Sequence, residues 1–176
     1  MPFPQKRSQP AKRPHASGRT GFSLIELLVV IAIILIIATL AIPRVIRSRI
    51  VANEGAAVSA LRTLASANLI YSNAYQVGYA PSLAALGPPG GGGPANASSS
   101  DLIDAVLAGG ARNGYTFAYA PVDTDGNGQF DQFSVNANPI TPGISGQRYF
   151  FVDHSNVLRF DLSGPANATS TPIPSR

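Results

Sequence analysis

A continuous apolar stretch near the N-terminus constrains the fold of this chain more than any other feature. Residues 22–42 read FSLIELLVVIAIILIIATLAI, and from Leu27 to Ile42 the only polar side chain is that of Thr39. A helix of about 21 residues rises about 30 Å, the hydrocarbon thickness of one bilayer. In lipid, a helix satisfies its backbone hydrogen bonds internally. We therefore predict that residues 22–42 form a transmembrane helix.

Glu26 is the one charged residue within this apolar stretch. An unpaired carboxylate in the bilayer is costly unless it is neutralised or partnered. One interpretation keeps Glu26 at the membrane interface, in contact with water. The other depends on cleavage after Gly21, which would give Phe22 a positively charged α-amino group. The Glu26 carboxylate of one subunit would then pair with that amine on a neighbour and set the axial stagger of the helices.

These positions resemble the prepilin N-terminus shared by type IV pilins and the pseudopilins of type II secretion. The matching residues are Gly21 before the cleavage point, the aromatic Phe22 after it, Glu26, the apolar run, and Pro43. The resemblance implies that a prepilin peptidase cleaves after Gly21 and N-methylates Phe22. It also implies that an inner-membrane assembly platform builds the helices into a filament, with help from Glu26.

The positive charge of the chain lies in the segment that the resemblance expects to be removed. Residues 1–21 form a basic leader, whereas residues 22–176 hold 8 basic and 9 acidic residues. The net charge of +4 therefore does not indicate a nucleic-acid partner. By the positive-inside rule the leader is expected in the cytoplasm. Its cations are Lys6, Arg7, Lys12, Arg13 and Arg19.

Residues 43–78 return to helical spacing. Pro43 has no backbone N–H and is expected to kink or interrupt the helix. After it, apolar side chains recur at steps of three or four, which predicts an amphipathic helix, and Gly78 is the expected stop. The predicted buried stripe consists of Val58, Leu61, Leu64, Ala65, Asn68, Tyr71 and Tyr75.

Residues 79–176 predict a loop-rich head domain. One helical turn is expected at residues 81–86, a surface loop at 87–100, and a short helix at 101–108, capped by Ser100. Period-two patterns then predict short antiparallel strands, and the tail from Gly164 is expected to be irregular. The strand segments are residues 115–120, 129–135, 148–153 and 157–160.

A long helix followed by a small antiparallel sheet is an α+β arrangement. We therefore predict a pilin-like fold. A long kinked helix, transmembrane over its first half, packs on an antiparallel β-meander.

One loop has side chains of the kind that bind calcium. Asp123, Asp125, Asn127 and Asp131 alternate with glycines, as in the first half of a calcium loop. The twelfth position counted from Asp123 is Ser134, where a helix–loop–helix calcium site needs glutamate. The alternative is a polar hairpin whose turn formers need no metal. Calcium is thus the one cofactor that the sequence raises, and both alternatives stay open.

A catalytic set is not evident in the sequence. His154 is a lone histidine in a turn, and the adjacent Ser155 has no second base for a triad. There is also no cysteine, which excludes disulfides and zinc–thiolate sites, and the C-terminal disulfide loop of many type IV pilins. We therefore expect a structural protein rather than an enzyme.

The most direct functional interpretation is a homo-oligomeric filament subunit. It would span the inner membrane once and then enter an extracellular type IV pilus. The missing cysteines and the acidic loop favour the alternative, a periplasmic pseudopilin of type II secretion, while the glycine/serine-rich loop and longer head favour the pilus. A hypothesis from another class is a monomeric calcium-binding domain on an uncleaved signal anchor.

Overall fold

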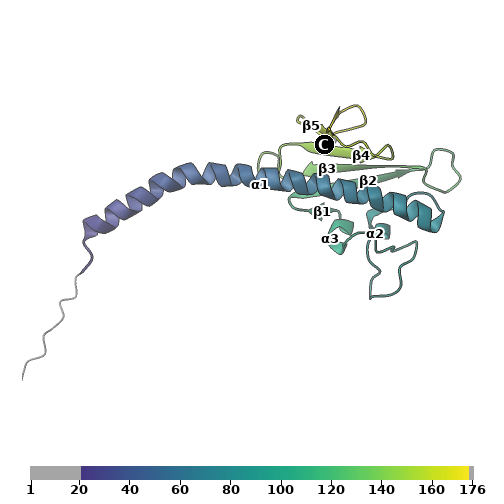
Figure 1. Cartoon of the computed structure of the whole chain (residues 1–176), viewed down its shortest axis with the longest axis horizontal. Coiled ribbons are helices and arrows are strands. Elements are labelled where there is room, and N and C mark those ends of the chain that lie inside the picture. The colour runs from purple at the N-terminus through teal and green to yellow at the C-terminus, as the bar shows by residue number, and fades with distance from the viewer. Residues whose placement is uncertain (1–20, 175–176) are drawn as a thin grey trace, which may run out of the picture. The chain divides into compact units, whose positions relative to one another are not determined.

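The computed structural model describes residues 21–174, so all of the predicted leader at residues 1–21 except Gly21 lies outside the described residues. The described part contains three helices and six strands (Figure 1). By its internal contacts the chain divides into two units, with the boundary between Leu40 and Ala41. We call residues 41–176 the head unit. The helices are α1 (Leu24–Tyr75), α2 (Leu83–Leu86) and α3 (Ala105–Ala108). The strands are β1 (Ala111–Arg112), β2 (Tyr115–Val122), β3 (Gln132–Pro139), β4 (Tyr149–Asp153), β5 (Arg159–Asp161) and β6 (Thr171–Pro172).

The N-terminal part of α1 is apolar around its whole circumference. None of the side chains from Phe22 to Leu40 is buried within the chain. By length and composition α1 is long and apolar enough to cross a membrane, as predicted for residues 22–42. A helix that is apolar on all sides needs lipid or other helices around it.

α1 continues through Pro43, so of the two expected alternatives, a kink or an interruption, the interruption does not occur. Pro43 has no N–H to donate to the carbonyl of Thr39, four residues earlier, but the turns on either side keep their own hydrogen bonds. The Thr39 hydroxyl donates to the carbonyl of Leu35 at 2.8 Å, as helical threonines commonly do. The predicted kink stays a prediction.

The six strands form a single antiparallel meander in the order β1 to β6. β2 and β3 pair over eight residues each, from Tyr115 opposite Pro139 to Val122 opposite Gln132. The predicted α+β class and the antiparallel meander are therefore confirmed. β1 and β6 were not predicted, because two-residue strands are too short to show a period of two.

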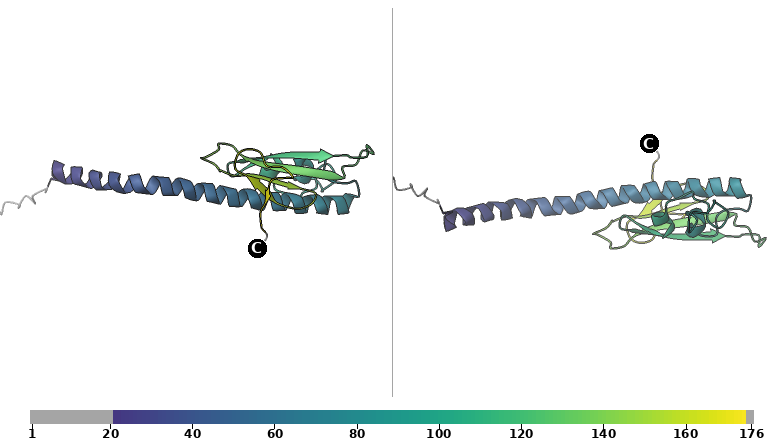
Figure 2. Two further views of the ribbon diagram at one scale, coloured as in Figure 1. Left: turned by 90° about the horizontal axis from the view of Figure 1, so that it is seen from above. Right: turned by 90° about the horizontal axis from the view of Figure 1, so that it is seen from below.

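The head unit holds its core between α1 and one face of the sheet, and Figure 2 shows α1 running along that face. Every second residue of β3 is buried, namely Phe133, Val135, Ala137 and Pro139. Opposite them, Leu61 and Leu64 of α1 are completely buried, which stabilises the fold by about 1.5–3 kcal/mol for each side chain. The predicted stripe of α1 is thus confirmed, with Val58 and Tyr75 packed at its margins.

The other face of the sheet is partly covered by the segment between β5 and β6. Ala166 in this segment is only 2 % exposed, and its carbonyl accepts a hydrogen bond from the Asn136 side chain of β3. Phe151 of β4 pairs with Asn136 and is also buried. Its neighbours Phe150 and Val152 belong to the core on the α1 side of the sheet, whereas Phe151 does not. The tail that we expected to be irregular therefore has a packing role.

The predicted helix at residues 101–108 is shorter than expected and has a different cap. α3 begins at Ala105, and the carboxylate of Asp104 accepts hydrogen bonds from the amides of Val106 and Leu107. Ser100 is buried instead, and its hydroxyl donates to the carbonyl of Ala85 at 2.8 Å. The amides of residues 100–103 bond to carbonyls at the end of α2 and of Gly87, so these residues do not enter the helix.

α1 ends at Tyr75, where the chain turns into the left-handed region at Gln76 and again at Gly78, whose φ angle is +81°. Gly78 forms an isolated bridge to Phe130, and a Cβ atom at residue 78 would overlap the Phe130 backbone. Gly78 is therefore needed for close approach of the β2–β3 loop, as well as for the turn after the helix.

Candidate assembly site

The predicted cleavage point lies just before α1, where residues 21–23 belong to no helix or strand. A Cβ atom added at Gly21 would meet no other atom within 4 Å, so the fold does not require glycine there. Phe22, the next residue, is 74 % exposed. Any steric requirement for glycine at residue 21 therefore does not come from contacts within residues 21–174.

Glu26 lies in the first turn of α1 and is exposed. A carboxylate in this turn interacts favourably with the unpaired amides at the start of the helix. Neither of the two ion pairs formed among residues 21–174 includes Glu26. The carboxylate is therefore available to a group on another molecule.

Around Glu26, large apolar side chains are exposed on every side of α1. Their exposed fractions run from 44 % at Val30 to 80 % at Leu24. Contiguous apolar surface of this extent marks a membrane or protein interaction surface. The described chain thus places one acid within an apolar surface, as the prepilin resemblance implies.

Glu54 is a buried acid that the sequence analysis missed. Its side chain is 6 % exposed, and its Oε2 atom contacts Nε and Nη2 of Arg148, each at 2.8 Å. Its Oε1 atom accepts the backbone amides of Gln147 and Arg148 at 2.9 and 3.1 Å. A signal was present, because Glu54 stands four residues before Val58 and so continues the buried stripe.

The residue before Glu54 fixes the same loop. The Asn53 side chain donates a hydrogen bond of 2.8 Å to the carbonyl of Ser145. The hydroxyl of the fully buried Tyr115 donates to the carbonyl of Arg148 at 2.8 Å. Burial is the main cause of a raised pKa for Tyr115, and the nearby Glu54 carboxylate adds to it. The loop between β3 and β4 is therefore tied to α1 at several points.

A second polar cluster lies inside the core, around Asn68. Its Oδ1 atom accepts the Ala80 amide at 3.3 Å and lies 2.8 Å from the Tyr119 hydroxyl, which is also 2.7 Å from the Ala80 carbonyl. The single hydroxyl proton of Tyr119 is donated to one of these two oxygens at a time. Burial raises the pKa of Tyr119 well above its ordinary value. Asn68 thus joins α1 to the segment after it and to β2.

The four predicted calcium ligands lie together in the loop between β2 and β3. The Asp123 oxygens accept the amides of Gly126 and Gly128, both at 2.8 Å, and Asp125 accepts the amide of Asn127 at 3.2 Å. The Asp131 carboxylate accepts the amide and the hydroxyl of Thr124. These bonds lower the pKa of Asp123, chiefly through the Gly128 amide, and that of Asp131, chiefly through the Thr124 hydroxyl.

The loop is therefore organised by its own hydrogen bonds. Within residues 21–174, no group of three or more acidic, histidine or cysteine side chains is arranged to hold a metal ion. A carboxylate oxygen that accepts one amide still has a lone pair for a cation. Calcium binding by this loop stays a prediction.

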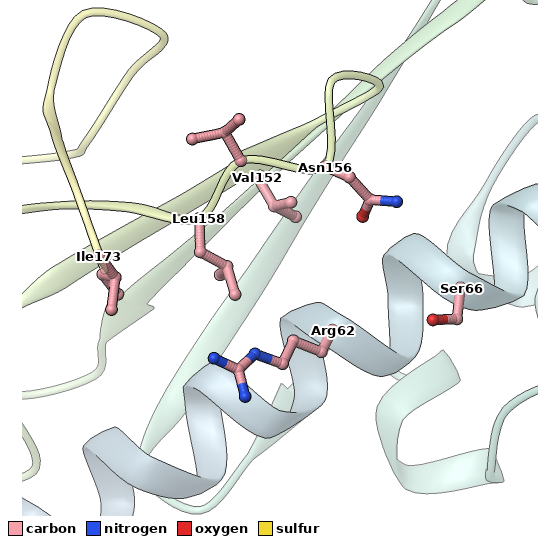
Figure 3. Close-up of a pocket in the computed structure, with 7 residues that line it drawn as sticks. Arg62, Ser66, Val152, Asn156, Leu158 and Ile173 are labelled. Atoms are coloured by element: carbon pink, nitrogen blue, oxygen red, sulfur yellow. The ribbon is translucent and has the colours of Figure 1, made fainter. Parts of the chain in front are cut away.

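An open pocket of about 490 Å³ lies between α1 and the C-terminal strands. Figure 3 shows Arg62 and Ser66 on α1 facing Val152, Leu158 and Ile173 across it. Its lining holds one cation, one hydroxyl and one amide, and no acid or histidine. This lining lacks the nucleophile–base pair that covalent catalysis needs.

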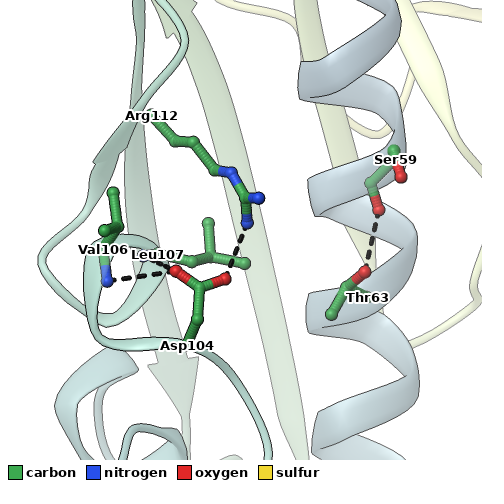
Figure 4. Close-up of polar contacts among 6 residues, drawn as sticks. All are labelled: Ser59, Thr63, Asp104, Val106, Leu107 and Arg112. Carbon is green, nitrogen blue, oxygen red and sulfur yellow. Dashed lines mark hydrogen bonds and ion pairs between the residues drawn. The ribbon is translucent and has the colours of Figure 1, made fainter.

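The other ion pair of the described chain supports α3. Arg112 of β1 contacts the Asp104 carboxylate at 2.6 Å (Figure 4), beside the α1 turn in which Thr63 donates to the carbonyl of Ser59. Amide bonds, that of Leu107 foremost, lower the pKa of Asp104, and Arg112 adds to the effect. Both side chains are about half exposed, so the pair contributes little stability.

The comparison with protein families agrees with the geometry of the N-terminal segment. The family described as "Prokaryotic N-terminal methylation motif" matches residues 17–42, which include Gly21, Phe22 and Glu26. This motif is the signature of type IV pilins and pseudopilins, and the predicted resemblance is thereby confirmed. No curated protein and no solved structure matches the chain.

The motif and the fold together define the class of protein. The chain has the N-terminal methylation motif, a long apolar helix and an α+β architecture, which support a type IV pilin-like or pseudopilin subunit. The motif implies processing by a prepilin peptidase, anchoring in a membrane before assembly, and a structural rather than a catalytic role.

Proposed function

We propose that this chain is the structural subunit of a type IV pilus-like filament, cleaved after Gly21 and N-methylated at Phe22. The observation that carries the proposal is the methylation motif at residues 17–42, placed on a helix whose apolar side chains are all unburied in the single chain. Such a surface is stable in a bilayer before assembly and in a bundle of like helices afterwards.

Transfer of the helix from lipid to the filament gains little hydrophobic free energy, because lipid tails are as apolar as leucine. Packing and polar contacts between helices must therefore supply the specificity. Glu26 is suited to this, since it is in neither ion pair of the described residues and is the only acid in the apolar surface that follows Phe22. Pairing between Glu26 of one subunit and the Phe22 amine of another would fix the stagger.

A pseudopilin of a type II secretion system is the second candidate. Two features favour it: the absence of cysteine, and the acidic loop between β2 and β3. The pseudopilin would stay in the periplasm, whereas the pilin would reach the cell surface. The methylation motif is common to both.

The test is the intact mass of the protein in a fraction sheared from the cell surface and in the membrane pellet. A sheared species that begins at methylated Phe22 supports the pilin. The same mass confined to the pellet favours the pseudopilin. A full-length mass that begins at Met1 or Pro2 contradicts both.

A matched pair of variants separates processing from folding. Gly21→Leu is expected to retain the leader, because a bulky residue blocks the peptidase, while the fold has space at this position. Gly55→Leu is the control, since Gly55 also has no neighbour within 4 Å of an added Cβ atom. Cleavage of both variants would contradict a role for Gly21 in recognition.

A further inference from the structure

Within the head unit, the exposed surface of α1 carries only positive charge. Its arginines are Arg44, Arg47, Arg49 and Arg62, and all four are exposed. The one acid of α1 in this unit, Glu54, is buried and paired with Arg148. Neither ion pair among residues 21–174 involves any of the four arginines. At about 100° per residue, Arg44 and Arg47 project from one side of α1, whereas Arg49 projects from the opposite side and Arg62 lies about four turns further on. We call Arg44 and Arg47 the arginine face.

The arginine face also offers apolar contact surface. Val51, about one turn after Arg47, is 67 % exposed. Arg47 and Val51 line an open pocket together with Ile50 of the same helix and Gln147 of the β3–β4 loop. A partner there would meet a cation beside a shallow apolar depression.

Negative charge concentrates in the loop between β2 and β3. Asp123, Asp125 and Asp131 lie within nine residues of one another, with no cation in the loop, and none belongs to either ion pair. The Gly78–Phe130 bridge places this loop at the C-terminal end of α1. From Arg47 to that end α1 rises about 42 Å, so the two charged surfaces of one copy cannot meet.

We infer that the acidic β2–β3 loop of one copy docks against the arginine face of a second copy. This inference rests on the proposed function, because it concerns contacts between subunits of one filament. Opposite charges at the two ends of one head unit produce a head-to-tail contact, which is heterologous and extends into an open helical filament. Val122, at the loop's edge, is 43 % exposed and supplies an apolar partner for Val51.

Exposed ion pairs of this kind determine the register between subunits more than they determine the strength of their association. Each one changes an association constant by about 1.5- to 5-fold and is weakened by salt. Helix packing therefore remains the main source of filament stability, and the loop–arginine contact selects one stagger among several.

Cysteine cross-linking tests the contact, because the chain has no cysteine of its own. Filaments of the double variant Arg47→Cys/Asp125→Cys are expected to give a ladder of disulfide-linked oligomers on mild oxidation. A mixture of the two single variants is expected to stop at dimers. Arg47→Cys/Ser98→Cys is the matched control, because Ser98 lies in an exposed loop without acids and is expected to give no ladder.

Charge reversal supplies a second readout. Arg47→Glu and Asp125→Lys are each expected to lower filament yield about threefold, and their combination to restore it. Asp125 is chosen because both of its hydrogen bonds come from a single residue, Asn127, whereas Asp123 holds the amides of two different glycines. Ser98→Lys is the control and is expected to leave the yield unchanged.

The outcomes separate this inference from the proposed function. If the wild-type chain forms no filament, the proposed function fails and this inference falls with it. If wild-type filaments form but give no ladder and show no rescue by the combined reversal, the inference alone is overturned. It is also overturned if Arg47→Glu only weakens binding of the chain to anionic phospholipid vesicles, which would make lipid the partner.

Discussion

Glu54 and Arg148, 94 residues apart in the chain, form an ion pair in which two guanidinium nitrogens contact one carboxylate oxygen. The other carboxylate oxygen accepts two backbone amides. The helix thereby positions the loop before β4 through a single buried side chain. Arg148 also lies over the rings of Phe150 and Phe160, at 5.4 and 5.7 Å from their centroids. Loss of the carboxylate would leave two amides and a guanidinium without partners.

We predict the stability ranking Glu54→Ala, Arg148→Ala, Glu54→Gln, from most to least destabilised. Glu54→Ala should cost about 2–4 kcal/mol, because unpaired buried amides add to the lost ion pair. Glu54→Gln keeps an acceptor for the amides and should cost about half as much. Arg148→Ala should cost about 2–3 kcal/mol, because it leaves the buried Glu54 carboxylate with its two amide bonds alone and removes the contacts to Phe150 and Phe160. Urea denaturation of the detergent-solubilised chain measures the ranking, and equal midpoints for the three variants would contradict it.

Gly146→Ala is predicted to destabilise the head unit by about 1–3 kcal/mol. A Cβ atom at residue 146 would overlap the ring of Tyr115, which is completely buried and bonded to the carbonyl of Arg148. The ring therefore has no free space into which to move. Thermal unfolding followed by circular dichroism provides the measurement. Gly164→Ala is the control, because its added Cβ meets nothing within 4 Å, and equal shifts for the two variants would refute the packing argument.

Stability is predicted to fall steeply above about pH 10, the ordinary pKa of tyrosine. Burial raises the pKa of Tyr115 and of Tyr119 in the folded chain. The folded state therefore keeps protons that the unfolded state has released. The contribution is fully present below the unfolded pKa and is lost as the pH rises above it, by about 1.4 kcal/mol per pH unit for each tyrosine.

The test combines denaturant midpoints from pH 9 to pH 11 with absorbance of the phenolate. Tyr119→Phe should reduce the pH dependence by about half, although it also removes a hydrogen bond at neutral pH. A flat stability profile across this range would show that these hydroxyls reach solvent and would rule out the buried arrangement.

The periodicity of the sequence was sufficient for the class of fold, because α1 and the longer strands bury one regular face. Periodicity failed where hydrogen bonds between segments distant in the sequence determined the structure. Ser100 was the expected helix cap, yet the amides after it bond to the end of α2, and Asp104 caps α3 instead. Glu54 was missed because its partner Arg148 is far away in the sequence.

At the candidate assembly site, the sequence was sufficient to recognise the motif but not to identify the molecule that contacts it. The roles proposed for Gly21, Phe22 and Glu26 involve a peptidase or other subunits, so a single chain shows only that these residues are accessible. The arginine face could not be recognised from the sequence alone, because only the structure shows that Glu54, the one acid on this part of α1, is buried and paired with Arg148.

The calcium hypothesis for the β2–β3 loop predicts that calcium raises the unfolding temperature and that a chelator reverses the rise. Oxygen ligands at alternate positions are the reason for this expectation. Asp125→Asn should weaken the effect at least several-fold, because it removes one charge from the loop while preserving its shape. Calorimetric titration of the purified chain with calcium provides the measurement. An unchanged unfolding temperature with no binding heat would refute the calcium hypothesis and leave a turn held by its own hydrogen bonds.

Glu26→Ala is predicted to insert into the membrane normally and to assemble poorly. Removal of a charge from an apolar helix makes insertion easier, so a loss of filaments cannot be attributed to failed insertion. The head unit should keep its unfolding temperature, because Glu26 lies outside that unit and in neither ion pair of residues 21–174. Glu26→Gln distinguishes charge from hydrogen bonding, since it keeps an acceptor for the Phe22 amine but loses the ion pair. The measurement is the yield of sheared filaments relative to processed subunit in the membrane. A wild-type yield from Glu26→Ala would refute the pairing of Glu26 with the Phe22 amine and leave packing alone to set the stagger.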